Sequence, residues 1–239
     1  MASSPYDQLL VVQGFDTSGD QLKHKRTHHP IRSEIAGVDE KIAELEVVSA
    51  EISARKHELD REQKRLDDEV SLIDDKRAQI DAKLYNGSVT ATKDLLALQD
   101  EAAMLLDRKN GIEDSELEIM ESVEEVSTEL EPVVTTIESL REARIVHESD
   151  LAAALDVIAS EIETAEQNRT QAAALVPPDL LAHYNSLRAD FEGVAVARLI
   201  GTTCDGCHMS LSAVAVDQIK KLPDDAVVTC DQCGRLLIR

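Results

Sequence analysis

Two closely spaced pairs of cysteines are the residues of this sequence best suited to chemistry. The four cysteines are Cys204, Cys207, Cys230 and Cys233, and all lie near the C-terminus. A Cys-x-x-Cys pair can place two thiolates on one metal ion, and two such pairs complete a tetrahedron around zinc. We therefore predict one zinc ion bound by these four side chains. Because four thiolates leave no position open for water, we expect a structural zinc rather than a catalytic one.

A disulfide framework is the alternative use of these cysteines. We expect zinc instead, because a cytoplasmic chain keeps its thiols reduced. The N-terminus, MASSPYDQLL, lacks a basic region followed by an apolar run, and no stretch reaches the roughly 18 apolar residues of a membrane span. The predicted location is therefore the cytoplasm, without membrane attachment. His208 would become a ligand only if a cysteine were displaced, and Gly206 and Gly234 are expected to supply permissive backbone in the two metal-binding turns.

The composition is that of long helices with an acidic surface. Aromatic residues make up 2% of the chain and charged residues 30%, with 25 basic against 47 acidic residues and a formal net charge of -22. Such a composition favours extended helices over a thick globular core. The acidic excess repels nucleic acid and anionic membranes over most of the surface, so any contact with RNA or DNA must be local.

Two apolar rows with a seven-residue period provide most of the chain's architecture. Sustained heptads of this kind predict a coiled-coil seam. The first row is Ile31, Val38, Leu45, Ile52, Leu59, Leu66, Ile73 and Ile80. The second row is Leu98, Leu105, Ile112, Ile119, Val126, Val133 and Leu140.

The two rows match each other in reverse order, which predicts an antiparallel hairpin within one chain. Ile80 pairs with Leu98 and Ile52 with Val126 at a constant sum of positions. The intervening stretch, KLYNGSVTATK, is expected to form the hairpin tip at about 85–91, with Asn86-Gly87 ending the first helix and Thr90 or Thr92 capping the second. The alternative is a parallel dimer, which the short loop disfavours. We expect a monomer or weak dimer.

The prolines and the cysteine pairs predict where the chain divides into domains. We predict a helical arm over 1–176, with a break near 28–30 and a kink near 132, and a second domain over 177–239 with a core of its own. That domain holds a short helix and the zinc ribbon, preceded by a strand in VAVARLI with Val194, Val196, Arg198 and Ile200 on one face. The fold class is mainly α: a long antiparallel two-helix coiled-coil hairpin with a small C-terminal β-rich zinc ribbon.

Three stretches resemble a known family. KLYNGSVTATKDLLALQDE, YNSLRADFEGVAVARLIGTTCDGCHMSLS and CDQCGRLLIR together are similar to the bacterial coiled-coil proteins with a C-terminal C4-type zinc-ribbon domain, in the same order along nearly the whole chain. The resemblance implies a helical hairpin with the ribbon at the end opposite the tip. It also implies adapter roles, because some relatives are associated with flagellar gene control through an alternative sigma factor or RNA.

Three classes of function remain open at this point. The first is a non-enzymatic adapter or scaffold that engages a macromolecular partner, expected to be a protein, through the ribbon and a possible second contact at Tyr85 in the tip. Such a tyrosine more often packs over its neighbours, here Val89 and Leu95. The second is a regulatory ribbon that binds RNA or DNA, linked to transcription or post-transcriptional control. The third, an enzyme, ranks last because no glycine-rich phosphate loop or nucleophile motif is present.

The hypothesis that the ribbon binds nucleic acid depends on a few of its basic side chains. Its candidate phosphate contacts are Arg198, Lys220, Lys221, Arg235 and Arg239. Nearby aspartates offset these charges, and aromatic residues for base stacking are missing. The simpler interpretation is that the cations compensate the negative zinc-thiolate centre and keep the domain soluble.

Overall fold

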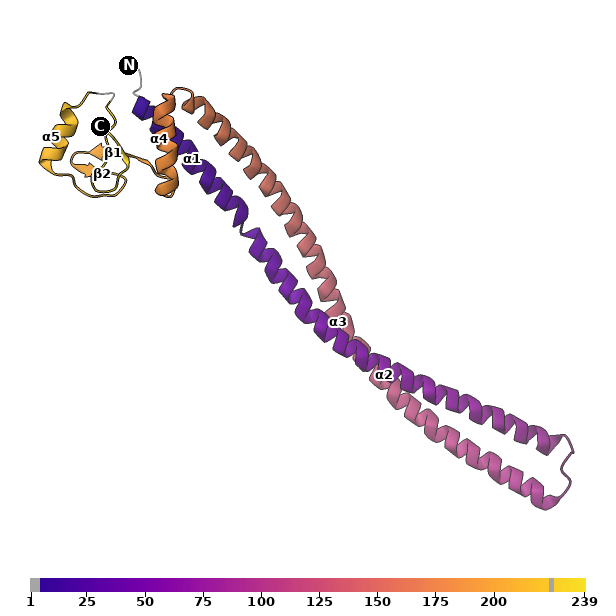
Figure 1. Ribbon diagram of the computed structural model, residues 1–239. Coiled ribbons are helices and arrows are strands. Elements are labelled where there is room, and N and C mark those ends of the chain that lie inside the picture. The colour runs from indigo at the N-terminus through magenta and orange to yellow at the C-terminus, as the bar shows by residue number, and fades with distance from the viewer. Residues whose placement is uncertain (1–4, 224–225) are drawn as a thin grey trace. The chain divides into compact units, whose positions relative to one another are not determined.

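The computed structural model describes residues 5–223 and 226–239, and long helices dominate it. The elements in chain order are α1 (Pro5–Thr27), α2 (Ile31–Tyr85), α3 (Thr92–Ala173), α4 (Pro178–Asp190), β1 (Val196–Ile200), β2 (Thr203–Cys204), α5 (Ala213–Lys221) and β3 (Leu236–Ile238) (Figure 1). The predicted break near residues 28–30 and the predicted fold class are confirmed. The chain forms two compact units, one of Glu34–His147 and the other of Met1–Ser33 with Glu148–Arg239.

The first unit is the antiparallel hairpin, in which α2 and the part of α3 up to His147 lie side by side (Figure 1). Ion pairs between the helices show the direction of pairing. Glu46 near the start of α2 binds Arg141, whereas Glu69 further along α2 binds the earlier Arg108, both at 2.5 Å. Because later residues of α2 pair with earlier residues of α3, the antiparallel arrangement within one chain is confirmed.

The buried residues of this unit follow the predicted seam. An apolar row that repeats every seven residues faces the partner helix along the whole contact. The buried members of the two rows are Ile52, Leu66, Ile73 and Ile80 on α2 and Val126 on α3, and Ile42 and Ile137 are buried beside these rows.

The hairpin turns where the sequence predicted, at Asn86-Gly87. Gly87 has φ +73°, a left-handed conformation that glycine adopts without the steric cost of a β-carbon. The side chain of Asn86 supports the turn, because its Oδ1 accepts a hydrogen bond of 2.9 Å from the Ser88 N–H. Helix α2 therefore ends at Tyr85 because the next residues reverse the chain.

The start of α3 differs from the prediction. Its first helical hydrogen bond runs from the Leu95 N–H to the Ala91 carbonyl, so Ala91 occupies the capping position and neither Thr90 nor Thr92 does. The helix then continues through Pro132 without interruption. The helix is therefore not broken at this proline, and the kink expected near 132 stays a prediction.

The second unit does not follow the predicted domain boundary at 176/177. Residues of α1, the end of α3, α4 and the ribbon share one apolar core, so one side of the ribbon packs together with the helices. Its buried members include Tyr6, Leu9, Val12, Ala172, Ala173, Val176, Tyr184, Ala195, Val196, Leu236 and Ile238. The heptad rows could not reveal this, because the packing joins residues from opposite ends of the sequence.

The ribbon sheet lies between this core and a second one. Its strand order is β2-β1-β3, with β1 antiparallel to β2 and parallel to β3. Val196 and Leu236 belong to the first core, whereas the next residues, Ala197 and Leu237, belong to the second. The strand predicted in VAVARLI is present as β1; both of its faces are covered at its start, whereas Ile200 at its end is 62% exposed.

The second core includes a helix that sequence reasoning missed. Helix α5 begins after Ser212, whose side chain accepts a 3.1 Å hydrogen bond from the Ala215 N–H as an N-cap. Its buried face consists of Val216 and Ile219. These side chains pack in the same cluster as the cysteines, so α5 covers the metal-binding turns on their apolar side.

We predict that the seam residue Ile52 stabilises the hairpin and that an exposed residue of the same helix does not. Ile52 is 4% exposed, whereas Val47 is 60% exposed. Ile52→Ala should lower the unfolding free energy of the hairpin by about 2–4 kcal/mol, because it removes buried methyl groups and leaves a cavity. Val47→Ala should change it by less than about 0.5 kcal/mol. Urea unfolding followed by circular dichroism measures both, and equal effects of the two substitutions would contradict the assigned seam.

Candidate metal centre and its supporting contacts

The structure brings the four predicted cysteines together. Their sulfur atoms all lie within 4.8 Å of one another, and Cys207 Sγ is 3.9 Å from Cys230 Sγ. A tetrahedron with zinc–sulfur bonds of about 2.3 Å has sulfur atoms about 3.8 Å apart. The donor set is therefore a closed four-thiolate site that fits one structural zinc ion, and the predicted ligands Cys204, Cys207, Cys230 and Cys233 form it.

The two cysteine pairs lie in turns with the same backbone pattern. In each turn, the residue four positions after the first cysteine donates its N–H back to that cysteine's carbonyl. His208 bonds to Cys204 and Gly234 to Cys230, both at 2.8 Å. Both donors have left-handed backbones, with φ of 60° for His208 and 78° for Gly234. His208 therefore has a backbone role in its turn and is not part of the metal cluster.

Gly206 is needed for a different reason from the predicted one. A β-carbon at this position would lie 2.8 Å from Arg235 Cδ and 2.9 Å from Ala197 Cβ. The first turn thus packs so closely against β1 and the second turn that no side chain fits. The sequence correctly singled out this glycine, but the reason is a close approach and not a left-handed backbone.

The metal-free thiols differ in acidity because their surroundings differ. Burial raises the pKa of Cys204, and burial raises the pKa of Cys230 to about 12. Burial also disfavours the Cys233 thiolate, but hydrogen bonds from the backbone and side chain of Arg235 outweigh it and lower the pKa of Cys233 to about 7. Protons held by the two buried thiols must leave when zinc binds.

Two of the five cations proposed as nucleic-acid contacts bind backbone carbonyls of the ribbon. Arg235 Nε donates to the Val194 carbonyl at 2.7 Å, and its guanidinium lies 4.9 Å from the centre of the Phe191 ring. Arg239 donates to carbonyls at the end of α5, including that of Ile219 at 3.0 Å. These two side chains therefore fasten the ribbon together.

The other three candidate cations remain exposed. Arg198 pairs with Asp7 of α1 at 3.3 Å, and Lys221 pairs with Asp217 at 2.5 Å on the surface of α5. Lys220 is exposed on the same helix. The structure therefore does not gather the five cations into one free basic surface.

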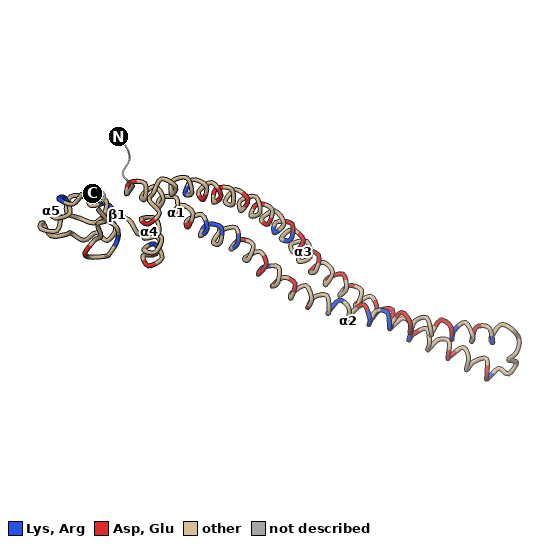
Figure 2. Tube along the Cα trace, turned by 45° about the horizontal axis from the view of Figure 1, so that its top comes forward, with Lys and Arg blue, Asp and Glu red and all other residues tan. Residues whose placement is uncertain are grey.

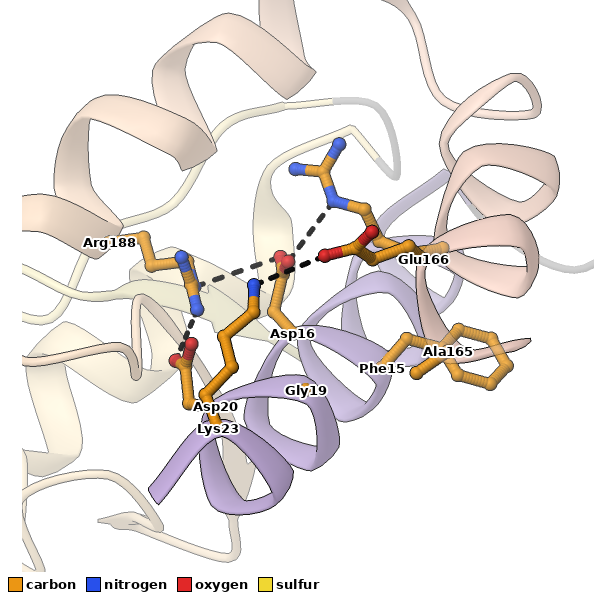
Figure 3. Close-up of a pocket in the computed structure, with 9 residues that line it drawn as sticks. Phe15, Asp16, Gly19, Asp20, Lys23, Ala165, Glu166 and Arg188 are labelled. Carbon is orange, nitrogen blue, oxygen red and sulfur yellow. Dashed lines mark hydrogen bonds and ion pairs between the residues drawn. The ribbon is translucent and has the colours of Figure 1, made fainter. Parts of the chain in front are cut away.

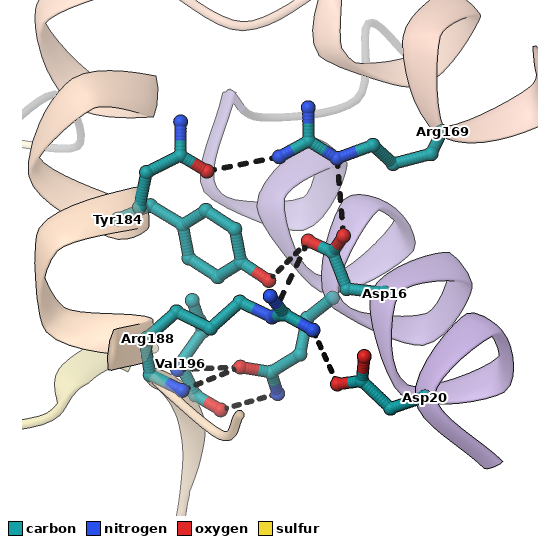
Figure 4. Close-up of polar contacts among 9 residues, drawn as sticks. Asp16, Asp20, Arg169, Tyr184, Arg188 and Val196 are labelled. Carbon is teal, nitrogen blue, oxygen red and sulfur yellow. Dashed lines mark hydrogen bonds and ion pairs between the residues drawn. The ribbon is translucent and has the colours of Figure 1, made fainter. Parts of the chain in front are cut away.

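A polar cluster that sequence reasoning missed joins α1, α3 and α4 (Figure 4). Asp16 is at its centre: it accepts hydrogen bonds from the Tyr184 hydroxyl at 2.8 Å and from Arg169 Nε at 3.1 Å. Arg188 approaches Asp16 at 3.7 Å and also binds Asp20. Burial and the bond to Asp16 raise the pKa of Tyr184, so the hydroxyl keeps its proton and remains a donor.

A cavity of about 80 Å³ lies next to this cluster (Figure 3). Its charged lining is balanced, with three acidic and three basic side chains that pair among themselves. They are Asp16, Asp20, Glu166, Lys23, Arg169 and Arg188. A charged ligand would have to displace existing ion pairs. The arrangement therefore fits a set of structural contacts between helices better than a ligand site.

Gln13 of α1 provides a second link that the sequence did not signal. Its Oε1 accepts hydrogen bonds from the Ala195 and Val196 N–H groups, and its Nε2 donates to the Val196 carbonyl, all at 2.8 Å. Ala195 and Val196 are almost completely buried. Each buried backbone group without a partner costs about 1–3 kcal/mol, so this one side chain has a large effect on the start of β1.

Comparison with known proteins identifies the class to which this architecture belongs. A CT398-like coiled coil hairpin domain matches residues 12–192, and a C4-type zinc ribbon domain matches residues 203–237. The chain therefore belongs to the family of CT398-like coiled-coil hairpin proteins with a C-terminal C4-type zinc ribbon, which confirms the family resemblance seen in the sequence.

Relatives in mycobacteria share part of the sequence. The uncharacterized protein Rv2229c of Mycobacterium tuberculosis is 31% identical over 163 residues, which are 65% of this chain and 63% of the relative. The uncharacterized protein ML1638 of Mycobacterium leprae is 31% identical over 160 residues, 64% of this chain and 66% of the relative. The matches thus span slightly less than two thirds of these relatives' own lengths.

Solved structures share the fold at lower sequence identity. A protein of Mycobacterium smegmatis is 19% identical with a TM-score of 0.86, covering 98% of this chain and 97% of the other. CT398 of Chlamydia trachomatis is 18% identical with a TM-score of 0.65, covering 98% and 96%. These likenesses establish the fold.

Over the described residues, none of the helices is both long and apolar enough to span a bilayer.

We predict that zinc affinity falls as the pH falls, with a change of slope near neutrality. Protons on Cys204 and Cys230, whose pKa values are raised, must be released at neutral pH, so affinity rises with pH through this range. Below about pH 7 Cys233 is protonated as well, and the slope should steepen by about one proton per zinc. Chelator competition at a series of pH values measures this, and a flat profile would contradict thiolate ligation.

We also predict opposite responses at the two left-handed positions of the metal-binding turns. Gly234→Ala should lower the thermal stability of the zinc-loaded protein by about 1–2 kcal/mol, because a β-carbon is strained at φ 78°. The added β-carbon would also lie 3.3 Å from the Phe191 ring. His208→Gly should be neutral or stabilising, because it relieves the same strain. Destabilisation by His208→Gly and none by Gly234→Ala would show that the histidine side chain, not its backbone, matters.

Proposed function

We propose that this protein is a non-enzymatic adapter that binds a partner protein through the outer surface of its zinc ribbon. The observation that carries this proposal is a set of large apolar side chains exposed on a domain in which four of the five candidate cations already have partners. These apolar side chains are Val194, Ile200, Met209, Val214, Leu222 and Val227. Exposed apolar side chains on a small, metal-fixed scaffold are suited to protein contact.

Part of this apolar set has a defined arrangement. Ile200 pairs with Thr203 of β2, and Thr203 forms a bridge with Ser210 on its other side. Met209, next to Ser210, is held by a 3.0 Å hydrogen bond from the Cys204 N–H to its carbonyl. Ile200 and Met209 therefore lie in segments on the two sides of β2, and the zinc turn fixes their positions before any partner binds.

The hairpin tip is the proposed second contact. Tyr85 is 87% exposed, so it does not pack over Val89 and Leu95 in the way that a purely structural tyrosine does. Tyrosine combines a large apolar ring with a hydroxyl that can donate or accept, and it is enriched where proteins bind each other. Its exposure at a turn with a fixed backbone supports a role in recognition.

Binding of RNA or DNA is less well supported. Arg235 and Arg239 are used inside the ribbon, and Lys221 is paired with Asp217. Between Lys109 and Arg141, α3 carries ten acidic residues and no lysine or arginine (Figure 2). Such a helix repels phosphates, so any nucleic-acid contact would depend on a few exposed lysines and weaken steeply with salt.

A comparison of three variants of the full-length protein tests the proposal. The partner is captured from the native cell by crosslinking and identified by mass spectrometry. We expect Ile200→Ser with Met209→Ser to reduce recovery at least tenfold, because it removes the apolar contact. Lys220→Ala with Lys221→Ala should leave recovery unchanged, as should treatment with nucleases. Val47→Ser, an exposed apolar position on α2, is the matched control.

The opposite pattern would overturn the adapter function. If nuclease treatment or the two lysine substitutions abolish recovery while the apolar substitutions do not, the ribbon binds nucleic acid. Tyr85→Ala reports separately on the tip: a loss of recovery supports the second contact, and an unchanged level confines binding to the ribbon. Zinc content is measured for every variant so that loss of the metal is not mistaken for loss of contact.

A further inference from the structure

The start of β1 has one edge that none of the strands in the described residues covers. On one side β3 pairs with it in parallel, with Val196 opposite Leu236. On the other side β2 begins to pair only at Leu199, which lies opposite Cys204. The polar backbone groups at the uncovered edge are the N–H groups of Ala195 and Val196 and the Val196 carbonyl. All three bind the side chain of Gln13. A single residue of α1 thus takes the place of a missing strand.

The same strand is connected to both metal-binding turns. The Asp205 N–H in the first turn donates to the Arg198 carbonyl of β1 at 2.9 Å. The second turn leads directly into β3, where the Leu236 N–H donates to the Ala195 carbonyl at 2.9 Å. Zinc holds the two turns together, and their position determines whether β1 presents its free edge to Gln13.

Apolar packing also connects the metal-binding turns to α1 through the sheet. Val196, Leu236 and Ile238 project from the sheet into the core that contains Leu9 and Val12 of α1. The opposite face of the sheet packs against the cysteines and α5. If the sheet loses its shape when zinc leaves, α1 loses both its hydrogen-bonding partners and part of the apolar surface on which it lies.

We propose that zinc binding and the docking of α1 are coupled, with Gln13 as the residue that links them. With zinc bound, the ribbon holds α1 against α3 and α4. Without zinc, the edge of β1 is no longer formed, α1 is released, and the apolar side chains of Tyr6, Leu9 and Val12 become accessible. The coupling makes the first helix a reporter of zinc occupancy, a regulatory property separate from the proposed adapter role.

Thermodynamic linkage provides the test, because coupling must act in both directions. If zinc favours docking of α1, then weakening the docking must weaken zinc binding. Gln13→Ala removes the three hydrogen bonds without touching a zinc ligand. We expect a loss of zinc affinity on the order of tenfold, within the usual range of coupling between sites. The measurement is competition with a chromophoric chelator, using full-length protein and Zn²⁺.

Two control variants separate the link from nonspecific effects. Gln21→Ala makes the same change at an exposed position of α1 and should leave zinc affinity unaltered. Arg198→Ala removes the exposed ion pair between the ribbon and Asp7 and should change affinity less than twofold, because exposed pairs contribute little. Unchanged affinity in Gln13→Ala, or an equal loss in Gln21→Ala, would overturn the proposal.

A measurement on the unaltered protein tests the other direction and does not depend on how the variant folds. Backbone hydrogen exchange is recorded before and after zinc is removed with a chelator. We expect the amides of residues 6–27 to lose protection together with those of the ribbon, while residues 38–80 of the hairpin keep theirs. Retained protection in α1 while the ribbon exchanges freely would show that the two are independent and would overturn the coupling.

Discussion

The second unit depends on one coordination centre that joins two distant turns of the chain. Cys204 and Cys207 come from the first turn, and Cys230 and Cys233 come from the second. A sheet with so few strand residues cannot stabilise itself by burial alone, since short sheets with little apolar surface are marginal in water. Zinc coordination supplies the missing free energy and fixes the strand β1 between two cores, so the packing of α1, α4 and α5 follows from it.

The hairpin obeys a different constraint, because a pair of helices has almost no interior. Few side chains on each helix are fully shielded, and the seam residues Ile52 and Val126 illustrate this burial. The remaining surface is rich in acidic side chains, and ion pairs such as Arg141 with Glu46 join the helices along its edges. These exposed pairs help to fix the register more than they add to stability.

The sequence contained most of the hairpin because its information is periodic and local. Heptad spacing identified the seam, and Asn86-Gly87 located the turn. The four cysteines could also be predicted as zinc ligands from the sequence, because metal coordination restricts both residue type and spacing. Helix α5 was missed because nine residues are too few for a period to stand out, and its N-cap Ser212 is a common residue. Gln13 and Asp16 were invisible for another reason: their partners lie more than 150 positions away, and polar residues on a helix are ordinarily solvated.

The central claim is that α1, α4 and the ribbon fold as one zinc-dependent unit, distinct from the hairpin of Glu34–His147. Differential scanning calorimetry of the full-length protein, with and without zinc, tests it most directly. We expect two transitions, of which only one moves to lower temperature when zinc is removed, with an enthalpy that corresponds to the helices as well as to the ribbon. A zinc-dependent transition whose enthalpy accounts for the ribbon alone, with the rest of the heat unchanged, would contradict the account.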